Sequence, residues 1–297
     1  MAQANPTSEK VRKEEKVFAN RSTTQKIPVF ALSLVGLFTF AVIFGPLIAP
    51  FGPNETNFDE VILPPAWQDG GTSKHLLGTD PLGRDILSRI IYGARITLLL
   101  SLSCILLYGT IGVTVGLISG YFGGTVDMIL MRLTDLWMSL PVIILAIILA
   151  TTFGPGMNTV IVSVGIMGWP YYARIFRGEA LSLKEQDFVR LARVAGANNM
   201  RIILAHLFPN IVNTLIILLT LDIGLVIILT ATLSFLGLGT QPPSCDWGLM
   251  LFEGRQYFHY AWWLITFPGV AILIAVLGFN MTGDWLRDIL DPKQKPR

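Results

Sequence analysis

Six long apolar blocks divide this chain, and they limit its fold more than any other feature of the sequence. A helix needs about 20 predominantly apolar residues to cross a bilayer. Only helices can cross as separate runs, because each backbone amide must find its hydrogen-bond partner within the segment. The pattern predicts an all-α, polytopic membrane protein with six transmembrane helices, near residues 27–50, 94–120, 126–152, 157–178, 210–236 and 261–284.

The composition agrees with this class. The chain is 52% hydrophobic and 14% charged, whereas soluble domains carry about 25% charged residues. The first apolar block follows a polar stretch and is too long for the apolar region of a secretory signal. We therefore expect the first block to be a retained transmembrane helix.

The distribution of lysine and arginine predicts the orientation. These residues gather before the first block, between the fourth and fifth blocks, and after the sixth, whereas the loop 237–260 has only Arg255. The positive-inside rule places the basic segments in the cytoplasm, so both termini are predicted there. The predicted organisation is a cytoplasmic tail (1–26), a first helix (27–50), an external segment (51–93), a five-helix core (94–284) with a cytoplasmic loop (179–209), and a second cytoplasmic tail (285–297).

Glycines and prolines within the blocks predict how the helices pack. Gly112, Gly116 and Gly120 recur every four residues, a spacing that lets another helix approach closely. Packing within the chain is favoured over a dimer face. Pro141 and Pro170 predict kinks in the third and fourth helices.

Charged residues within or beside the blocks raise separate questions. Asp222 lies near the middle of the fifth block, where a charge costs roughly 2.5–3.5 kcal/mol on insertion scales. It is expected either to line a transport pathway or to make a structural hydrogen bond, and both interpretations stay open. Arg132 and Asp135, three residues apart, are expected to form an anchoring pair on one helix face.

No constellation typical of an enzyme stands out. The chain has no Gly-Lys dipeptide and therefore no Walker A loop, and it has no G-x-S-x-G elbow. His75, His206 and His259 are far apart and form no metal-binding spacing. The remaining classes are a pore, a transporter, or a membrane subunit driven by another protein.

The two cysteines do not indicate a disulfide. Cys104 lies in an apolar block, and Cys245 lies in a polar loop that the orientation places outside the cell. An impermeant thiol reagent is therefore expected to label Cys245 from outside.

The basic stretch between the fourth and fifth blocks, "LSLKEQDFVRLARVAGANNMRIILAHLFPN", is longer than an ordinary connection between helices. Phe188, Leu191 and Ala192 recur at helical spacing, and Gly196 is expected to end that helix. A second short run, Met200 to Leu207, leads into the fifth block. The segment either docks into a groove of another protein or lies on lipid headgroups.

This stretch resembles the coupling loop of ABC importer membrane subunits, written E-A-A-x-x-x-G and closed by I-x-L-P. Arg190, Leu191 and Ala192 stand in place of E-A-A, Gly196 matches the glycine, and Phe208-Pro209-Asn210 resemble the closing L-P-N. Arginine replaces the glutamate and leucine replaces one alanine, so the resemblance supports the docking geometry more than any particular ion pair with the ATPase. The resemblance implies that the ATPase contact uses Arg190, Leu191, Ala192, Arg193, Ala195, Gly196, Ala197, Leu207 and Pro209.

Three further stretches are similar to the C-type membrane subunit of dipeptide and oligopeptide importers: His75 to Leu100, Leu233 to Arg255, and Phe267 to Lys293. Thr230 departs from this pattern, because relatives often carry an acidic residue near that position. The outer loops "GTDPLGRD" and "QPPSCDWG" are expected either to shape the external mouth and meet a binding protein or to be rigid surface loops. The mouth candidates are Asp80, Arg84, Asp85, Asp246 and Trp247.

The resemblance implies a permease subunit of an ATP-driven peptide importer in the bacterial plasma membrane. The implied partners are a homologous B-type permease subunit, two ABC ATPase subunits, an extracytoplasmic binding protein and membrane lipid, with no nucleic acid. ATP and Mg would be bound by the ATPases, with no cofactor or metal in this chain. Importers of nickel chelates, opines, glutathione or oligosaccharides share the pattern, and a stand-alone channel or secondary transporter is disfavoured because no internal repeat is evident.

Overall fold

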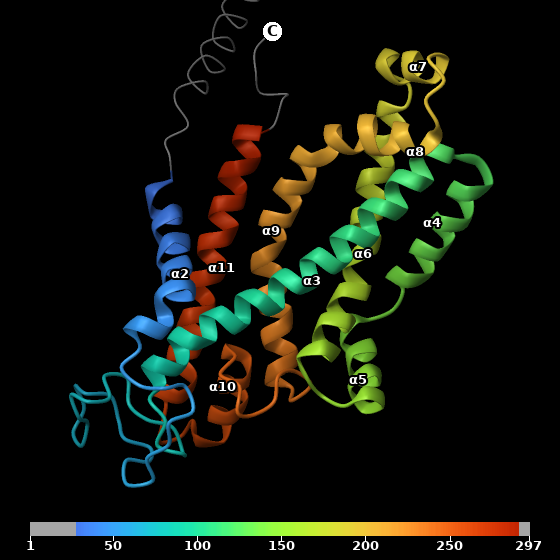
Figure 1. Ribbon diagram of the computed structural model, residues 1–297. Helices are drawn as coiled ribbons and strands as arrows, with labels where there is room; N and C mark the ends of the chain where they lie inside the picture. Colours follow the sequence, from blue (N-terminus) through green and yellow to red (C-terminus); the bar gives the residue numbers. More distant parts are fainter. Residues whose placement is uncertain (1–27, 291–297) are drawn as a thin grey trace, which may run out of the picture.

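The computed structural model describes residues 28–290, which form a set of long helices joined by loops at their two ends (Figure 1). The predicted tail 1–26 and the end of the tail 285–297 lie outside the described residues. The elements are α2 (Val29–Ile48), α3 (Ile86–Phe122), α4 (Gly124–Met138), α5 (Val142–Phe153), α6 (Met157–Leu183), α7 (Asp187–Val194), α8 (Asn199–Ile202), a π-helical turn (Ile203–Leu207), α9 (Phe208–Phe235), α10 (Trp247–Gly254), a 3₁₀ turn (Arg255–Tyr257) and α11 (Trp263–Leu290).

The helices confirm the predicted all-α polytopic class. Four of the described helical segments are long and apolar enough to cross a membrane: α2, α3, the continuous run Asn199–Phe235, and α11. α4 and α5 meet at a bend of 85°, and they make a fifth span if the bent pair is counted as one. The predicted fourth block corresponds to α6, whose 27 residues are long enough to span at about 1.5 Å per residue, although α6 is less apolar. Six spans are consistent with this arrangement.

The first helix of the core begins earlier than predicted. α3 starts at Ile86 because the Asp85 carboxylate caps it, accepting a hydrogen bond from the Ser88 amide at 2.8 Å. Such a cap satisfies one of the amides that the first helical turn leaves without a partner. The external segment therefore ends at a fixed helix terminus.

The glycine stripe of α3 packs against α6, as predicted for packing within the chain. A methyl group built at Gly112 would lie 2.4 Å from Cβ of Tyr172, and one at Gly120 would lie 2.6 Å from Cβ of Ala180. At Gly116 it would lie 2.7 Å from the carbonyl oxygen of Ala173. At these three positions, on successive turns of α3, the contact with α6 thus leaves no room for a side chain.

The two prolines predicted to kink helices differ in their effect on the structure. Pro141 precedes α5 and lies at the break between α4 and α5, so the third block bends there. Pro170 lies within α6, which continues through it. Because proline has no N–H, the carbonyl of Ile166 loses its usual partner, and the Trp137 indole N–H donates to that oxygen at 2.7 Å.

The expected pair of Arg132 and Asp135 is not the contact that the structure contains. Asp135 instead accepts a hydrogen bond from Arg174 of α6 at 2.6 Å. Just over two turns earlier on α4, Asp127 accepts from Arg177 of α6 at 2.6 Å. Two ion pairs therefore hold α4 to α6 across the helix interface.

Two hydrophobic cores are present in the described residues: one is shared by α3, α6 and α9, and the other joins α2, α10 and α11. The Phe38 ring lies 5.6 Å from the Trp247 ring and 5.4 Å from the Phe279 ring, both edge to face. The start of α2, the end of α11 and α7 lie at one end of the molecule, while α10 and the loop that follows α2 lie at the other (Figure 1). The predicted cytoplasmic and external segments are thus separated along the helix axes.

We predict that Gly116→Ala weakens the α3–α6 contact by about 1–3 kcal/mol, the usual cost of adding atoms to a filled core. Gly178→Ala on α6 is the matched control, because a methyl group there meets nothing within 4 Å and alanine favours the helix. Thermal denaturation in detergent measures both. Equal midpoints for the two variants would show that the stripe is not a tight interface.

Candidate functional site

The projecting helix α7 has a well-defined end. The Ala197 amide donates to the Ala192 carbonyl at 3.0 Å, and the Gly196 amide donates to the Arg193 carbonyl at 3.1 Å. This pair of bonds is the Schellman arrangement, which needs a left-handed residue after the helix. Gly196 has φ +82°, a conformation that glycine adopts without a steric penalty. The predicted helix end at Gly196 is therefore present.

The two sides of α7 face different surroundings. Val189 is fully buried and belongs to the core that α3, α6 and α9 share. Leu191 and Val194, on the outer side, are 68% and 88% exposed. Exposed large apolar side chains at the tip of a projection are typical of a surface that another molecule covers.

Polar contacts fasten this segment to the end of α3. The Tyr121 hydroxyl donates to the Asn199 side chain at 2.8 Å, and the Arg193 guanidinium lies 5.9 Å from the Tyr121 ring. Lys184 donates to the Gly120 carbonyl at 2.9 Å. Contacts before and after α7 thus tie this segment to α3.

The other predicted coupling residues are distributed along the same segment. Arg190, Arg193, Ala195 and Gly196 are exposed, Ala192 and Ala197 are half-buried, and Leu207 is fully buried in the core. Pro209 is exposed and lies at the start of α9, where a helix tolerates proline. The predicted second run is not separate, because α8 and the π turn continue into α9.

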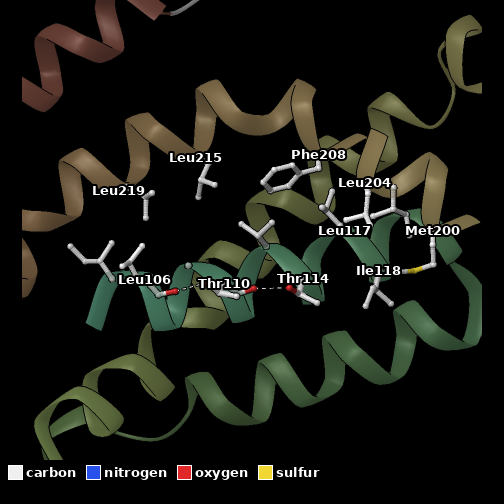
Figure 2. Close-up of a pocket in the computed structure, with 14 residues that line it drawn as sticks. Leu106, Thr110, Thr114, Leu117, Ile118, Met200, Leu204, Phe208, Leu215 and Leu219 are labelled. Carbon is white, nitrogen blue, oxygen red and sulfur yellow. Dashed lines mark hydrogen bonds between the residues drawn. The ribbon is translucent and has the colours of Figure 1, made fainter. Parts of the chain in front are cut away.

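An apolar groove of about 330 Å³ runs beside this segment, between α3 and the run from α8 to α9 (Figure 2). Met200, Leu204 and Phe208 line one wall. The Thr110 and Thr114 hydroxyls of the other wall donate to carbonyls of their own helix, at 2.6 and 2.7 Å. The groove therefore offers only apolar contacts to whatever lies against it.

Asp222 lies on α9 where this helix meets α3 and α6. Its Oδ2 accepts hydrogen bonds from the Tyr172 hydroxyl at 2.8 Å and from the Tyr108 hydroxyl at 3.2 Å. Asp222 also lines a second pocket of about 330 Å³. The structure thus places it both in a hydrogen-bond network and at a cavity, and its role in a pathway stays a prediction.

At the opposite end of the molecule, four charged side chains form a buried cluster. Arg84 Nε lies 2.6 Å from Asp80 Oδ2, and Arg89 Nη1 contacts the same oxygen. Glu253 of α10 accepts from Arg84 at 3.1 Å and from Arg89 at 3.0 Å. The cluster ties the external segment, α3 and α10 together.

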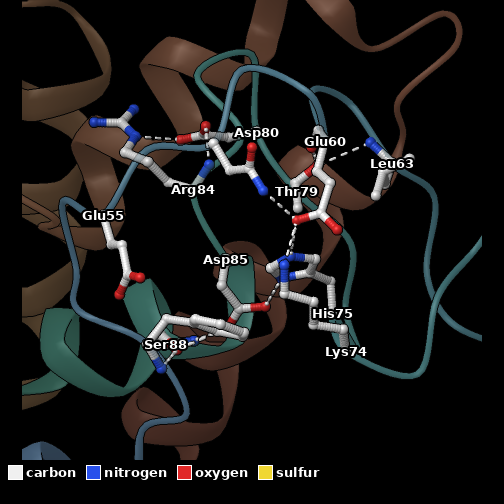
Figure 3. Close-up of polar contacts among 12 residues, drawn as sticks. Glu55, Glu60, Leu63, Lys74, His75, Thr79, Asp80, Arg84, Asp85 and Ser88 are labelled. Carbon is white, nitrogen blue, oxygen red and sulfur yellow. Dashed lines mark hydrogen bonds and ion pairs between the residues drawn. The ribbon is translucent and has the colours of Figure 1, made fainter.

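A second polar cluster lies next to it (Figure 3). The His75 ring lies between Asp85, 2.9 Å from Nδ1, and Glu60, 3.2 Å from Nε2. Lys74 also donates to Glu60 at 2.6 Å. The hydrogen bonds from Lys74 and then His75 hold the pKa of the Glu60 carboxyl below its ordinary value.

The last residues of the loop before α10, Cys245 and Asp246, are buried as well. Asp246 caps α10 by accepting from the Leu249 amide at 3.2 Å, and it accepts from Thr97 and Thr240 at 3.1 Å each. Burial raises the pKa of its carboxyl, although these donors act in the opposite direction. The Trp247 indole donates to the carbonyl of Ile90 at 2.9 Å.

The five external-mouth candidates are therefore internal side chains. Asp80, Arg84, Asp85, Asp246 and Trp247 are each at most 4% exposed, so they hold the outer loops to one another rather than presenting themselves to a partner. This burial argues against direct contact of these side chains with a partner, and the role of the two loops at an external mouth stays a prediction.

Labelling of Cys245 is corrected for the same reason. Its side chain is buried, and burial raises the pKa of the thiol to about 11. Because the thiolate is the reactive form, a thiol reagent is expected to leave Cys245 largely unmodified in the folded chain, whichever side it is added from.

Sequence reasoning missed four residues that the structure brings into these sites. Arg89 and Glu253 complete the external cluster from positions 164 residues apart, and Tyr108 and Tyr172 position Asp222. Asp80, Arg84 and Arg89 lie close together in the sequence, but the residues before Ile86 are not helical, so their spacing does not predict a shared side. No local signal pointed to Glu253 or to the two tyrosines.

The fold and these sites define a polytopic α-helical membrane protein with the layout of a transport subunit. Residues 112–296 match the model of the binding-protein-dependent transport system inner membrane component, and residues 21–65 match the N-terminal TM domain of oligopeptide transport permease C. The chain belongs to the family of binding-protein-dependent transport system inner membrane components, the permease subunits of ABC importers. The resemblance found in the sequence is confirmed.

Individual relatives cover most of the chain. The dipeptide transport system permease protein DppC of Escherichia coli (strain K12) is 45% identical over 90% of this chain and 89% of its own. The di/tripeptide transport system permease protein DppC of Pseudomonas aeruginosa is 40% identical over 87% and 86%. A chain of the MetNI methionine ABC transporter has a similar fold, with a TM-score of 0.55, 20% identity, and coverage of 69% of this chain and 97% of that chain.

We predict that Asp80→Asn destabilises the external end by about 3–5 kcal/mol, because it leaves two buried arginines with one shared acidic partner. Lys74→Ala is the control, since it removes an ion pair whose lysine is half exposed and should cost at most about 1 kcal/mol. The apparent melting temperature in detergent measures the difference. A similar small shift for both variants would contradict the assigned role of the cluster.

Proposed function

We propose that this chain is one of two membrane subunits of an ATP-driven importer that carries short peptides across the bacterial plasma membrane. The observation that carries the proposal is α7, a rigidly fastened projection whose tip exposes Leu191 and Val194. The membership of the family supports the class of transporter. Peptide cargo is supported by relatives whose names describe dipeptide permeases at 40–45% identity.

The proposed assembly contains a homologous membrane subunit, two ABC ATPase subunits and an external substrate-binding protein. ATP and Mg belong to the ATPases in this proposal, and the chain by itself is not an enzyme. A group of three or more His, Cys, Asp and Glu residues that could hold a metal ion is absent from residues 28–290.

In the proposed orientation, α7 lies in the cytoplasm together with both termini. The basic residues of the segment 179–209 support this orientation through the positive-inside rule. The external segment after α2 then lies outside the cell, and its two polar clusters hold a fixed platform at the start of α3.

The proposed coupling path begins at the tip of α7. An ATPase groove that grips Leu191 and Val194 would move Val189, which is packed in the core of α3, α6 and α9. The continuous run from α8 through the π turn into α9 carries the displacement toward Asp222. ATP would change the direction of opening only because the ATPase grips one arrangement more tightly than the other.

We predict that Leu191→Asp abolishes stable binding of the ATPases, because a carboxylate at an apolar contact must be desolvated without a partner. Leu191→Met is the matched control, since it keeps the apolar tip at similar volume. The complex, co-expressed with its ATPases and membrane partner, is purified through a tag on this chain. The yield of co-purified ATPase per permease is then measured.

Loss of the ATPase with Leu191→Asp and retention with Leu191→Met is the expected result. Because Leu191 is exposed, the variant should still enter the membrane in native amounts. Retention of fully coupled ATPase by both variants would overturn the proposal that α7 is the contact.

A further inference from the structure

The Asp222 site holds a carboxylate in a fixed direction. Tyr172, the closer of the two hydroxyl donors, is fully buried. Its ring packs edge to face on the Tyr108 ring, with centroids 5.0 Å apart. Both hydroxyls donate to Oδ2, and no described side chain or amide donates to Oδ1. One oxygen is therefore held in place, and the other remains available to a ligand.

The pocket that Asp222 lines lies between α6 and α9, and Tyr108 of α3 also lines it. Besides Tyr108 and Asp222, it is lined by Val164, Met167, Gly168, Tyr171, Leu225, Val226 and Leu229. Asp222 is the one charged residue among these lining residues, so no lysine or arginine in the lining neutralises it. The pocket offers one carboxylate in an otherwise apolar and aromatic lining.

This chemistry selects a cationic organic group. A carboxylate beside phenol rings binds an ammonium through an ion pair and through attraction to the ring faces. A divalent metal ion would need more oxygen ligands than one carboxylate supplies. The volume of about 330 Å³ falls in the range of about 300–1,000 Å³ typical of small-ligand pockets.

We propose that Asp222 binds the primary ammonium group at the amino terminus of a peptide as the peptide passes through the membrane. This inference rests on the proposed function for the peptide, while the ammonium chemistry comes from the pocket itself. In this role Asp222 and Tyr171 contact the cargo, whereas Tyr172 positions the carboxylate.

A single carboxylate is expected to bind the ammonium weakly, as a transport pathway requires. Transport requires binding that is favourable enough for entry and weak enough for release. One ion pair in a pocket that opens to its surroundings meets both conditions. It also needs no particular peptide side chain, because every unmodified peptide carries the same terminal group.

The first test compares uptake and ATP hydrolysis in the complete reconstituted complex, with binding protein saturated with alanylalanine. Asp222→Asn keeps the shape and the hydrogen bonds from the tyrosines but removes the charge. We expect about 10- to 100-fold less peptide per ATP, the usual loss when a charged hydrogen bond is removed. Asp222→Glu should recover part of the uptake, and Thr220→Ala on the same helix is the control.

A purely structural role would give another pattern. Asp222→Asn would then lower complex yield and ATP hydrolysis together, or would leave both hydrolysis and uptake unchanged. Either result overturns the proposal, and so would loss of uptake that Asp222→Glu fails to restore at normal complex yield.

The second test needs no variant. A carbodiimide is added to the native complex without binding protein, and mass spectrometry measures the modification of Asp222. Alanylalanine should protect Asp222, and N-acetylalanylalanine, which has no ammonium, should not. Equal protection by both compounds, or protection by neither, would contradict the ammonium site.

Failure of this inference is distinguishable from failure of the proposed function. If the complex takes up alanylalanine with ATP but Asp222 is unprotected, the importer proposal stands and the ammonium site falls. If the complex moves no peptide while ethylammonium protects Asp222, the site stands and the peptide cargo is wrong.

Discussion

The close approach of α3 and α6 is the contact on which the other features depend. The two helices touch backbone to side chain through Gly112, Gly116 and Gly120, where no larger residue fits. In lipid, helices gain little from burying apolar surface against each other, so close packing of this kind supplies the specificity. The contact brings Tyr108 beside Tyr172 and so builds the position of Asp222. It also brings the end of α6, from which α7 projects, beside the end of α3.

The two ends of the molecule are stabilised in different ways. The end that carries the loop between α2 and α3 is held by charges around Arg89, whose side chain is 1% exposed, and its partners Asp80 and Glu253. Buried ion pairs fix geometry more reliably than they add stability, and they resist rearrangement because separating them leaves an unpaired charge. The opposite end instead exposes apolar side chains on α7. The first end is therefore a rigid structure, whereas the second presents an exposed apolar surface that a partner can cover.

Features that depend on neighbouring residues could be predicted from the sequence. Apolar blocks predicted the helices, the glycine spacing predicted tight packing, and Gly196 predicted the end of α7. Contacts between distant positions could not be predicted, because nothing near Asp222 indicates Tyr108, 114 residues away. The burial of two loop residues was also missed. "QPPSCDWG" is polar in composition, yet Cys245 and Asp246 are buried, and Thr97 and Thr240 supply the hydrogen bonds that the Asp246 carboxylate needs there. The sequence of α7 also does not show which of its apolar residues is buried: Val189 is buried, whereas Leu191 is exposed.

The central claim is that this chain moves its cargo only as part of an ATP-driven assembly. The most direct measurement is uptake of labelled alanylalanine into liposomes that contain either this chain alone or the complete complex with binding protein and ATP. The account predicts uptake that requires ATP, both membrane subunits and the ATPases, with no uptake by this chain alone. Uptake by the chain alone, without ATP, would contradict the account and would make the protein a channel or a secondary transporter.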